Sequence, residues 1–199
     1  MYEGYSCKFI PIKNKISSSD AGFVDTDHMY ELMHGVYKHD ALCREDYFID
    51  YQNYYTFMGV MNLRTMFSTA ARAFVKAGEP DRAKEMLDKS MLAMRRFPLC
   101  GIPFGFTSND LMVLEQIRLY YSLGEKDKAD SLAAEYWEEL YKNTVFWLEF
   151  FDVAKDNFEL CGHHVHYLID ELKDGDNTEF ADSVAEKYNS LLKAASGTV

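Results

Sequence analysis

The sequence predicts an all-α fold of stacked antiparallel helix pairs, preceded by a short extended N-terminal arm. Two observations carry this prediction. Apolar residues recur at three- and four-residue spacing over long stretches, and short turns that contain glycine separate these stretches. Only four prolines interrupt the 199 residues, and the content of 48% hydrophobic and 27% charged residues is ordinary for a folded globular protein.

The N-terminal segment differs from the rest of the chain. Residues 5–12 alternate well enough to form a short strand. We therefore expect residues 1–24 to form an extended arm and residues 25–199 to form a helical repeat domain. Asp25 and Thr26 are both candidate N-caps for the first, short amphipathic helix, because the side-chain oxygen of either can accept from a backbone N–H of the first turn.

Three helix pairs are expected, at about 54–96, 109–142 and 144–195. In the first pair, one apolar stripe ends at Gly78, and Pro80 opens the next helix, since proline is tolerated in a first turn. A connection of about four residues forces two helices to lie antiparallel.

The turns of the first two pairs repeat each other. Residues 78–83 and 124–129 share Gly, Glu, Asp and Ala in the same order, with an offset of 46 residues. Glycine supplies a left-handed C-cap, and alanine lets two helices approach closely. A weaker third turn is expected at residues 174–176, with Ala181 in the close-approach position.

The net charge of −11 lies entirely in the second half of the chain. Residues 1–100 contain 13 basic and 13 acidic side chains, whereas residues 101–199 contain 8 basic and 19 acidic ones. Such a surface repels phosphate backbones and anionic lipid, so nucleic acid is not an expected partner. No apolar run approaches the roughly 20 residues of a membrane span, and nothing at the N-terminus is typical of a signal peptide. The chain is therefore expected either to be cytoplasmic or to belong to a longer exported protein.

One histidine cluster is a candidate metal site. His163 and His166 share a helical face with Glu159 one turn earlier, and His164 lies between them. The spacing matches no closed zinc site, and such clusters commonly cap helices or pair with acids. We expect neither a metal nor a cofactor, and a metal-dependent enzyme built on these residues is the third hypothesis. Serine-nucleophile and phosphate-loop motifs are absent from the sequence, so this chain is not expected to be an enzyme.

An aromatic cluster has two interpretations. Tyr51, Tyr54 and Tyr55 could form a platform on which a sugar or peptide stacks. Their helical spacing favours packing against the first hairpin instead.

The repeat resembles the tetratricopeptide family, although the offset of 46 residues exceeds the family's usual length of about 34. The large, small and turn positions of that family's pattern are matched by Phe67, Ala70, Ala71, Phe74, Gly78, Ala83 and Leu87. The resemblance implies a concave groove formed by the first helix of each pair. On that assumption, the polar partner contacts are Asn62, Arg64, Arg72 and Arg118, and the arginines favour an acidic ligand.

A second resemblance covers roughly residues 2–140. The segments 5–12, 23–30 and 62–94 together resemble the C-terminal soluble region of a bacterial inner-membrane family related to protein O-mannosyltransferases. It implies a domain on the periplasmic face of the inner membrane, joined to an N-terminal membrane-spanning enzyme whose catalytic residues are absent here. The expected function is non-catalytic docking of a protein or peptide partner or acceptor. The alternative is a free-standing soluble adaptor in the cytoplasm.

Overall fold

The structure is a computed structural model, and it describes residues 2–7, 24–46, 48, 61–100 and 108–196. The chain forms two compact units, Met1–Arg96 and Phe97–Val199. The all-α fold of packed helix pairs is confirmed. None of the described helices combines the length and the apolar composition that a membrane span requires.

Unit 1 contains a small N-terminal hairpin, two short helical segments and one pair of long helices. Its described elements are β1 (Tyr2–Glu3), β2 (Ser6–Cys7), α1 (Thr26–Tyr30), the π-helix η1 (Glu31–Val36), the 3₁₀-helix η2 (Asp40–Cys43), α3 (Met61–Ala77) and α4 (Pro80–Met94). The two strands pair antiparallel. Most of the strand expected at 5–12 lies outside the described residues.

The N-cap predicted at Asp25 is confirmed, because its side chain accepts from the His28 backbone N–H at 3.1 Å. α1 continues directly into η1, and the two segments bury Met29 and Met33. The Lys89 ammonium on α4 donates to the carbonyl oxygen of Met33 at 2.7 Å and so ties η1 to the helix pair.

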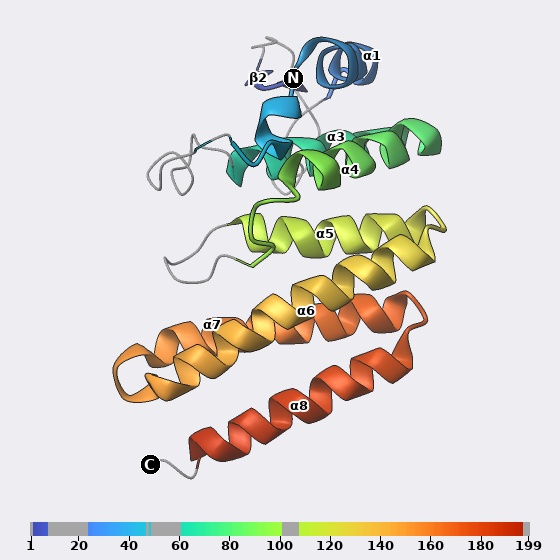
Figure 1. Cartoon of the computed structure of the whole chain (residues 1–199). Coiled ribbons are helices and arrows are strands. Elements are labelled where there is room, and N and C mark those ends of the chain that lie inside the picture. The colour runs from blue at the N-terminus through green and yellow to red at the C-terminus, as the bar shows by residue number, and fades with distance from the viewer. Residues whose placement is uncertain (1, 8–23, 47, 49–60, 101–107, 197–199) are drawn as a thin grey trace, which may run out of the picture. The chain divides into compact units, whose positions relative to one another are not determined.

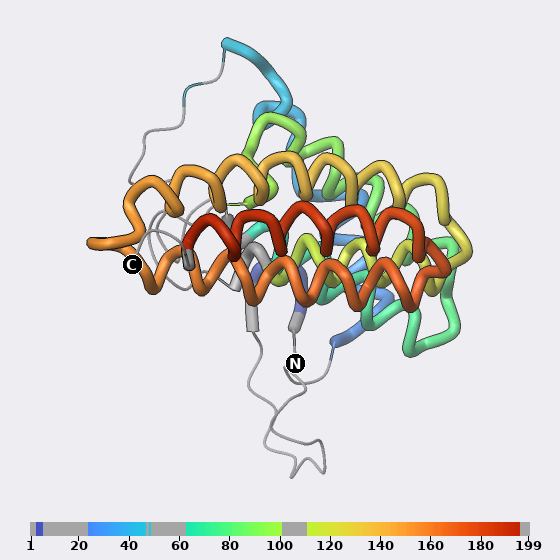
Figure 2. The backbone as a smooth tube through the Cα atoms, turned by 90° about the horizontal axis from the view of Figure 1, so that it is seen from below, coloured from blue at the N-terminus to red at the C-terminus, as the bar shows by residue number. Residues whose placement is uncertain are grey.

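The described residues of unit 2 form a stack of four helices: α5 (Ser108–Ser122), α6 (Lys126–Glu149), α7 (Phe151–Asp174) and α8 (Thr178–Ser196). Helices that follow each other in the chain pack together, and in addition α5 contacts α7 and α6 contacts α8. In Figure 2, α8 runs alongside both α6 and α7, and it contacts both helices. The first helices of the two pairs are therefore neighbours, and so are the second helices.

The repeated turn predicted from the sequence is present with the same geometry in all three pairs. Gly78 and Gly124 have φ of 77° and 76°, in the left-handed region that glycine adopts without strain. After α3, the Gly78 N–H donates to Val75 at 3.1 Å and the Glu79 N–H donates to Phe74 at 2.9 Å. The pair of bonds after α5 is equivalent, with distances of 3.0 and 2.9 Å.

The third turn uses an aspartate where the first two use glycine. Asp176 has φ of 56°, and its N–H donates to Lys173 at 3.1 Å while that of Asn177 donates to Leu172 at 2.8 Å. Five residues after each left-handed residue comes a fully buried alanine: Ala83, Ala129 and Ala181. The close-approach role predicted for these alanines therefore fits all three pairs.

Candidate functional site

The structure locates only some of the predicted partner contacts. Tyr51, Tyr54 and Tyr55 lie outside the described residues, and the side chain of Asn62 does too.

The described arginines occupy very different environments. Arg64 is only 1% exposed, so its guanidinium belongs to the interior and does not suit a direct contact with a partner. Arg72 on the same helix is half-buried. Arg118 on α5 is 55% exposed and is the predicted contact best placed to meet a ligand.

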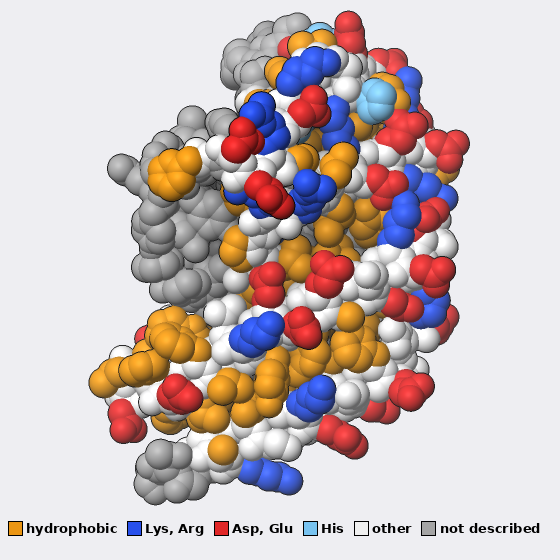
Figure 3. All heavy atoms as spheres, in the orientation of Figure 1, with side chains coloured by type: hydrophobic (Ala, Val, Ile, Leu, Met, Phe, Trp, Pro, Cys, Tyr) orange, Lys and Arg blue, Asp and Glu red, His pale blue; other side chains and the backbone are white. Residues whose placement is uncertain are grey.

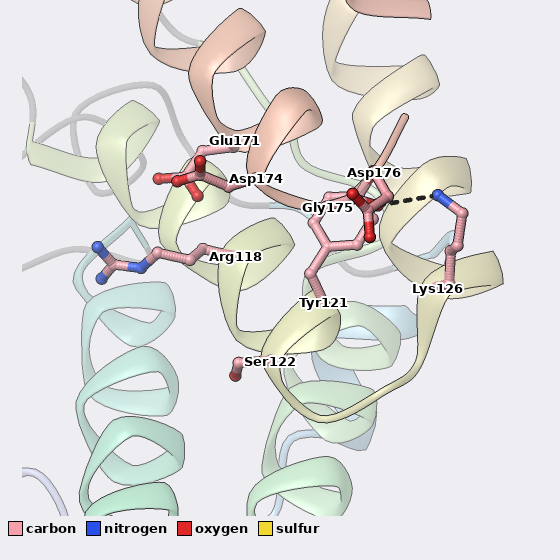
Figure 4. A pocket seen from close by; sticks show the side chains of 8 residues that line it. All are labelled: Arg118, Tyr121, Ser122, Lys126, Glu171, Asp174, Gly175 and Asp176. Atoms are coloured by element: carbon pink, nitrogen blue, oxygen red, sulfur yellow. Dashed lines mark hydrogen bonds between the residues drawn. The ribbon is translucent and has the colours of Figure 1, made fainter. Parts of the chain in front are cut away.

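Arg118 lines a pocket of 380 Å³ between the C-terminal ends of α5 and α7 (Figure 4). This volume lies within the range of about 300–1,000 Å³ that small-ligand pockets occupy. The lining residues come from the end of α5, the start of α6, the end of α7 and the turn before α8: Arg118, Tyr121, Ser122, Lys126, Glu171, Asp174, Gly175 and Asp176.

A hydrogen-bonded group around Asp130 fixes Tyr121, one of the residues that line this pocket. The Tyr121 hydroxyl donates to Asp130 at 2.5 Å, and the Asn177 amide donates to the same oxygen at 2.7 Å. Burial alone would raise the pKa of Asp130, but hydrogen bonds from Tyr121, Asn177 and Lys126 more than offset it, so the pKa is lowered. Burial raises the pKa of Tyr121. This carboxylate therefore joins α5, α6 and the last turn.

The turn must pass close to the aromatic ring of Tyr121. A Cβ atom added at Gly175 would lie 2.5 Å from that ring, so only glycine fits there. The Lys126 ammonium donates to the Gly175 carbonyl at 3.0 Å and lies 5.3 Å from the centre of the same ring. These contacts fix one wall of the pocket.

The charges in the pocket have both signs. Nη2 of Arg118 lies 3.5 Å from the buried Glu115. In Figure 4 the carboxylates of Glu171 and Asp174 lie beside each other, and the Arg118 side chain extends away from them. Oε2 of Glu171 is buried without a hydrogen-bond partner.

Burial raises the pKa of Glu171, nearby acids add to the effect, and Arg118 opposes it. An acidic ligand, expected from the arginines alone, would meet the carboxylates of Glu171, Asp174 and Asp176 as well as the guanidinium. The pocket therefore suits a polar ligand that both accepts and donates hydrogen bonds better than it suits a simple anion.

The histidine cluster is divided between the interior and the surface. His164 is 5% exposed, and a hydrogen bond of 2.8 Å joins its Nδ1 to the Tyr136 hydroxyl on α6. Burial lowers the pKa of His164 to about 4, and the neighbouring His163 adds to the effect. His164 therefore acts as a neutral hydrogen-bonding group between α6 and α7.

The other candidate metal ligands lie on the surface and not in the interior with His164. His163 and His166 are exposed, and Glu159 pairs with Lys155 at 3.2 Å. In the part of the chain that the structure describes, no three or more His, Cys, Asp or Glu side chains are grouped to hold a metal ion. The structure thus gives the metal-enzyme hypothesis no geometric support.

Sequence reasoning missed Tyr121 and Glu171 as pocket residues, and Asp130 as the hydrogen-bond acceptor of Tyr121. They come from three helices, and no local spacing connects them. The signal that could have indicated the pocket is the shared turn, because it aligns the end of α5 with the end of α7.

Comparisons with protein-family models, with curated proteins and with solved structures found no match for the chain.

Proposed function

We propose that this chain is a non-catalytic helical-repeat interaction domain that docks a protein or peptide partner. The arrangement of unit 2 carries the proposal: α5 and α7, the first helices of two pairs, lie side by side, and the Arg118 pocket opens between their ends. In tetratricopeptide-like stacks the first helices line the face that binds extended peptides.

The chemistry of this face fits a peptide. Peptides present backbone donors and acceptors together with charged side chains, and the pocket offers a guanidinium, an ammonium and three carboxylates. Tyr167 of α7 and Leu111 of α5 add exposed apolar surface, at 53% and 40% exposed. A face with both polar and apolar contacts can select a peptide by sequence.

The test uses peptides selected from a random library against the whole protein. Their affinities are then measured for the double variant Arg118→Ala/Asp174→Asn and for the control Lys142→Ala, which changes an exposed charge on α6. We expect the double variant to bind about tenfold more weakly or worse, and the control to bind like the unchanged protein. Equal affinity for all three proteins, with unchanged melting curves, would refute docking at this pocket.

We further propose that the domain is the periplasmic tail of a membrane glycosyltransferase-like protein, which rests on sequence resemblance alone. The alternative is a free-standing soluble adaptor. Cell fractionation with an antibody against this domain separates the two proposals. An inner-membrane band much larger than 23.1 kDa, digested by protease only after the periplasm is opened, supports the tail. A soluble band near 23.1 kDa supports the adaptor.

A further inference from the structure

Unit 2 exposes a group of large apolar side chains where α6 turns into α7. Phe146, Phe150 and Val153 are 48%, 45% and 84% exposed. The ring centres of Phe146 and Phe150 lie 4.9 Å apart, and Phe146 lies equally close to the ring of Trp147. Figure 3 shows hydrophobic side chains gathered at this end of the unit. A single exposed apolar residue is ordinary, but a cluster marks an interaction surface.

The turn itself is unusual among the helix connections of the unit. α6 ends at Glu149 and α7 begins at Phe151, so only Phe150 separates them. Phe150 makes no side-chain cap, its carbonyl accepts from Val153 at 3.1 Å, and Ala154 departs from helical geometry with φ of −139°. Turns normally carry polar residues, so three apolar side chains presented at this one are not explained by the turn geometry.

A groove of 450 Å³ lies beside this tip, between the first half of α7 and the last half of α8. Apart from the Lys155–Glu159 ion pair, its lining is apolar and consists of Phe151, Phe158, Tyr188, Leu192 and Ala195. Rings follow one another along the floor: Phe151 is 5.4 Å from Phe158, which is 6.4 Å from Tyr188. The groove is thus open, apolar and large enough to receive bulky side chains of a partner.

The rim of this surface on the α7 side is acidic. Residues 149–159 carry four exposed acids (Glu149, Asp152, Asp156 and Glu159) and one lysine, Lys155, which pairs with Glu159. Apolar anchors with negative charges beside them repel an anionic lipid surface. They complement a partner that places positive charges next to its own apolar stripe.

We propose that the surface formed by the α6–α7 tip and the α7–α8 groove binds an amphipathic helix whose apolar face is flanked by lysine and arginine. A helix inserts side chains at i, i+3, i+4 and i+7 into such a groove, and its basic residues then reach Asp152 and Asp156. This is a second docking surface, separate from the α5–α7 face, and it does not depend on Arg118.

The test uses two synthetic helical peptides of about 20 residues with the same Leu and Phe stripe. One carries Lys and Arg beside the stripe, and the other carries Glu in their place. Fluorescence anisotropy measures the binding of each peptide to the whole protein. We expect the basic peptide to bind and the acidic peptide to bind about tenfold more weakly or not at all.

Variants then locate the binding. Val153→Asp, and separately Asp152→Lys/Asp156→Lys, should each weaken binding of the basic peptide about tenfold. Leu92→Asp is the matched control, since Leu92 is a 58% exposed leucine in unit 1, and it should leave binding unchanged. Arg118→Ala/Asp174→Asn should also leave binding unchanged, which keeps this proposal distinguishable from docking on the α5–α7 face.

Three results would overturn the proposal. Equal binding of both peptides would show that charge does not select the partner, and no binding of either would show that the surface is not a helix groove. Concentration-dependent self-association that Val153→Asp abolishes, measured by sedimentation, would show that the occupant is a second copy of this chain.

Discussion

The stability of unit 2 should fall in mild acid because of His164. The ring is 5% exposed and hydrogen-bonded to Tyr136, and burial lowers its pKa from 6.5 to about 4 in the folded protein. In the unfolded chain the ring titrates normally. Between pH 6.5 and about 4, the unfolded state therefore binds a proton that the folded state does not, and the free energy of unfolding decreases as the pH falls through this window.

The size of the effect follows from the shift. Each pKa unit corresponds to about 1.4 kcal/mol, so the whole shift corresponds to about 3 kcal/mol of unfolding free energy. The protein loses all of this contribution below about pH 4. Between pH 7 and pH 5, His164 alone should reduce the free energy of unfolding by about 2 kcal/mol. That is a large share of the roughly 5–15 kcal/mol that stabilises a typical domain.

Urea unfolding followed by tryptophan fluorescence measures this loss directly. The two tryptophans of the chain, Trp137 and Trp147, both lie in unit 2, so the signal reports the unit that contains His164. The comparison is between the unchanged protein and His164→Gln, which cannot take up the proton. The quantity compared is the change in unfolding free energy from pH 7 to pH 5, so a constant destabilisation by the substitution cancels.

The expected result is that His164→Gln loses about 2 kcal/mol less than the unchanged protein over this interval. The control His166→Gln changes an exposed histidine on the same helix and leaves the His164–Tyr136 pair intact, so it should keep the original pH dependence. Equal pH dependence in the unchanged protein and His164→Gln would refute the reasoning, because the buried ring would then not be neutral in the folded state.

Three further predictions concern the effects of single substitutions on the free energy of unfolding. Gly162→Ala should destabilise unit 2 by about 1–3 kcal/mol in urea unfolding, because the new Cβ would lie 2.2 Å from the Tyr188 hydroxyl. Gly78→Ala should lower the free energy of unfolding by about 1–2 kcal/mol, because a φ of 77° disfavours any side chain. A variant as stable as the unchanged protein would contradict this. Asp130→Ala should lower the free energy of unfolding by about 1–3 kcal/mol, because Tyr121, Lys126 and Asn177 lose their common acceptor. The difference between the variant and the unchanged protein should become smaller at a pH low enough to protonate the Asp130 carboxylate.

The helix pairs could be predicted because their signals are local. An apolar stripe, a left-handed residue and a buried alanine all lie within one helix–turn–helix segment, so the turns at Gly78 and Gly124 could be identified from residue types alone. The third turn gave a weaker signal because Asp176 takes the place of glycine. Aspartate tolerates the left-handed region better than most residues, and the hydrogen bonds of the turn are unchanged.

The pocket and the buried histidine could not be predicted in the same way. Tyr121, Asp130 and Asn177 meet only because α5, α6 and the last turn pack together, and no spacing in the sequence links them. For His164, the periodicity shows which face of α7 is apolar but not that Tyr136 of α6 lies opposite with a hydroxyl group. Arg64 is the converse case, because its charge predicts a surface position, whereas the side chain is only 1% exposed.

Helix length accounts for the exposed apolar tip of unit 2. α5 has 15 residues, whereas its partner α6 has 24, and the two are joined at one end by a short turn. At 1.5 Å per residue, α6 extends about 14 Å beyond the start of α5. α7 also has 24 residues, against 19 in α8. The end of α6 therefore extends past α5, the end of α8 covers only the groove side of the tip at Phe151, and Phe146, Phe150 and Val153 are left exposed. Charged residues would have stabilised such an overhang in water at least as well as aromatic ones, so its apolar character favours a role in binding over a role in folding.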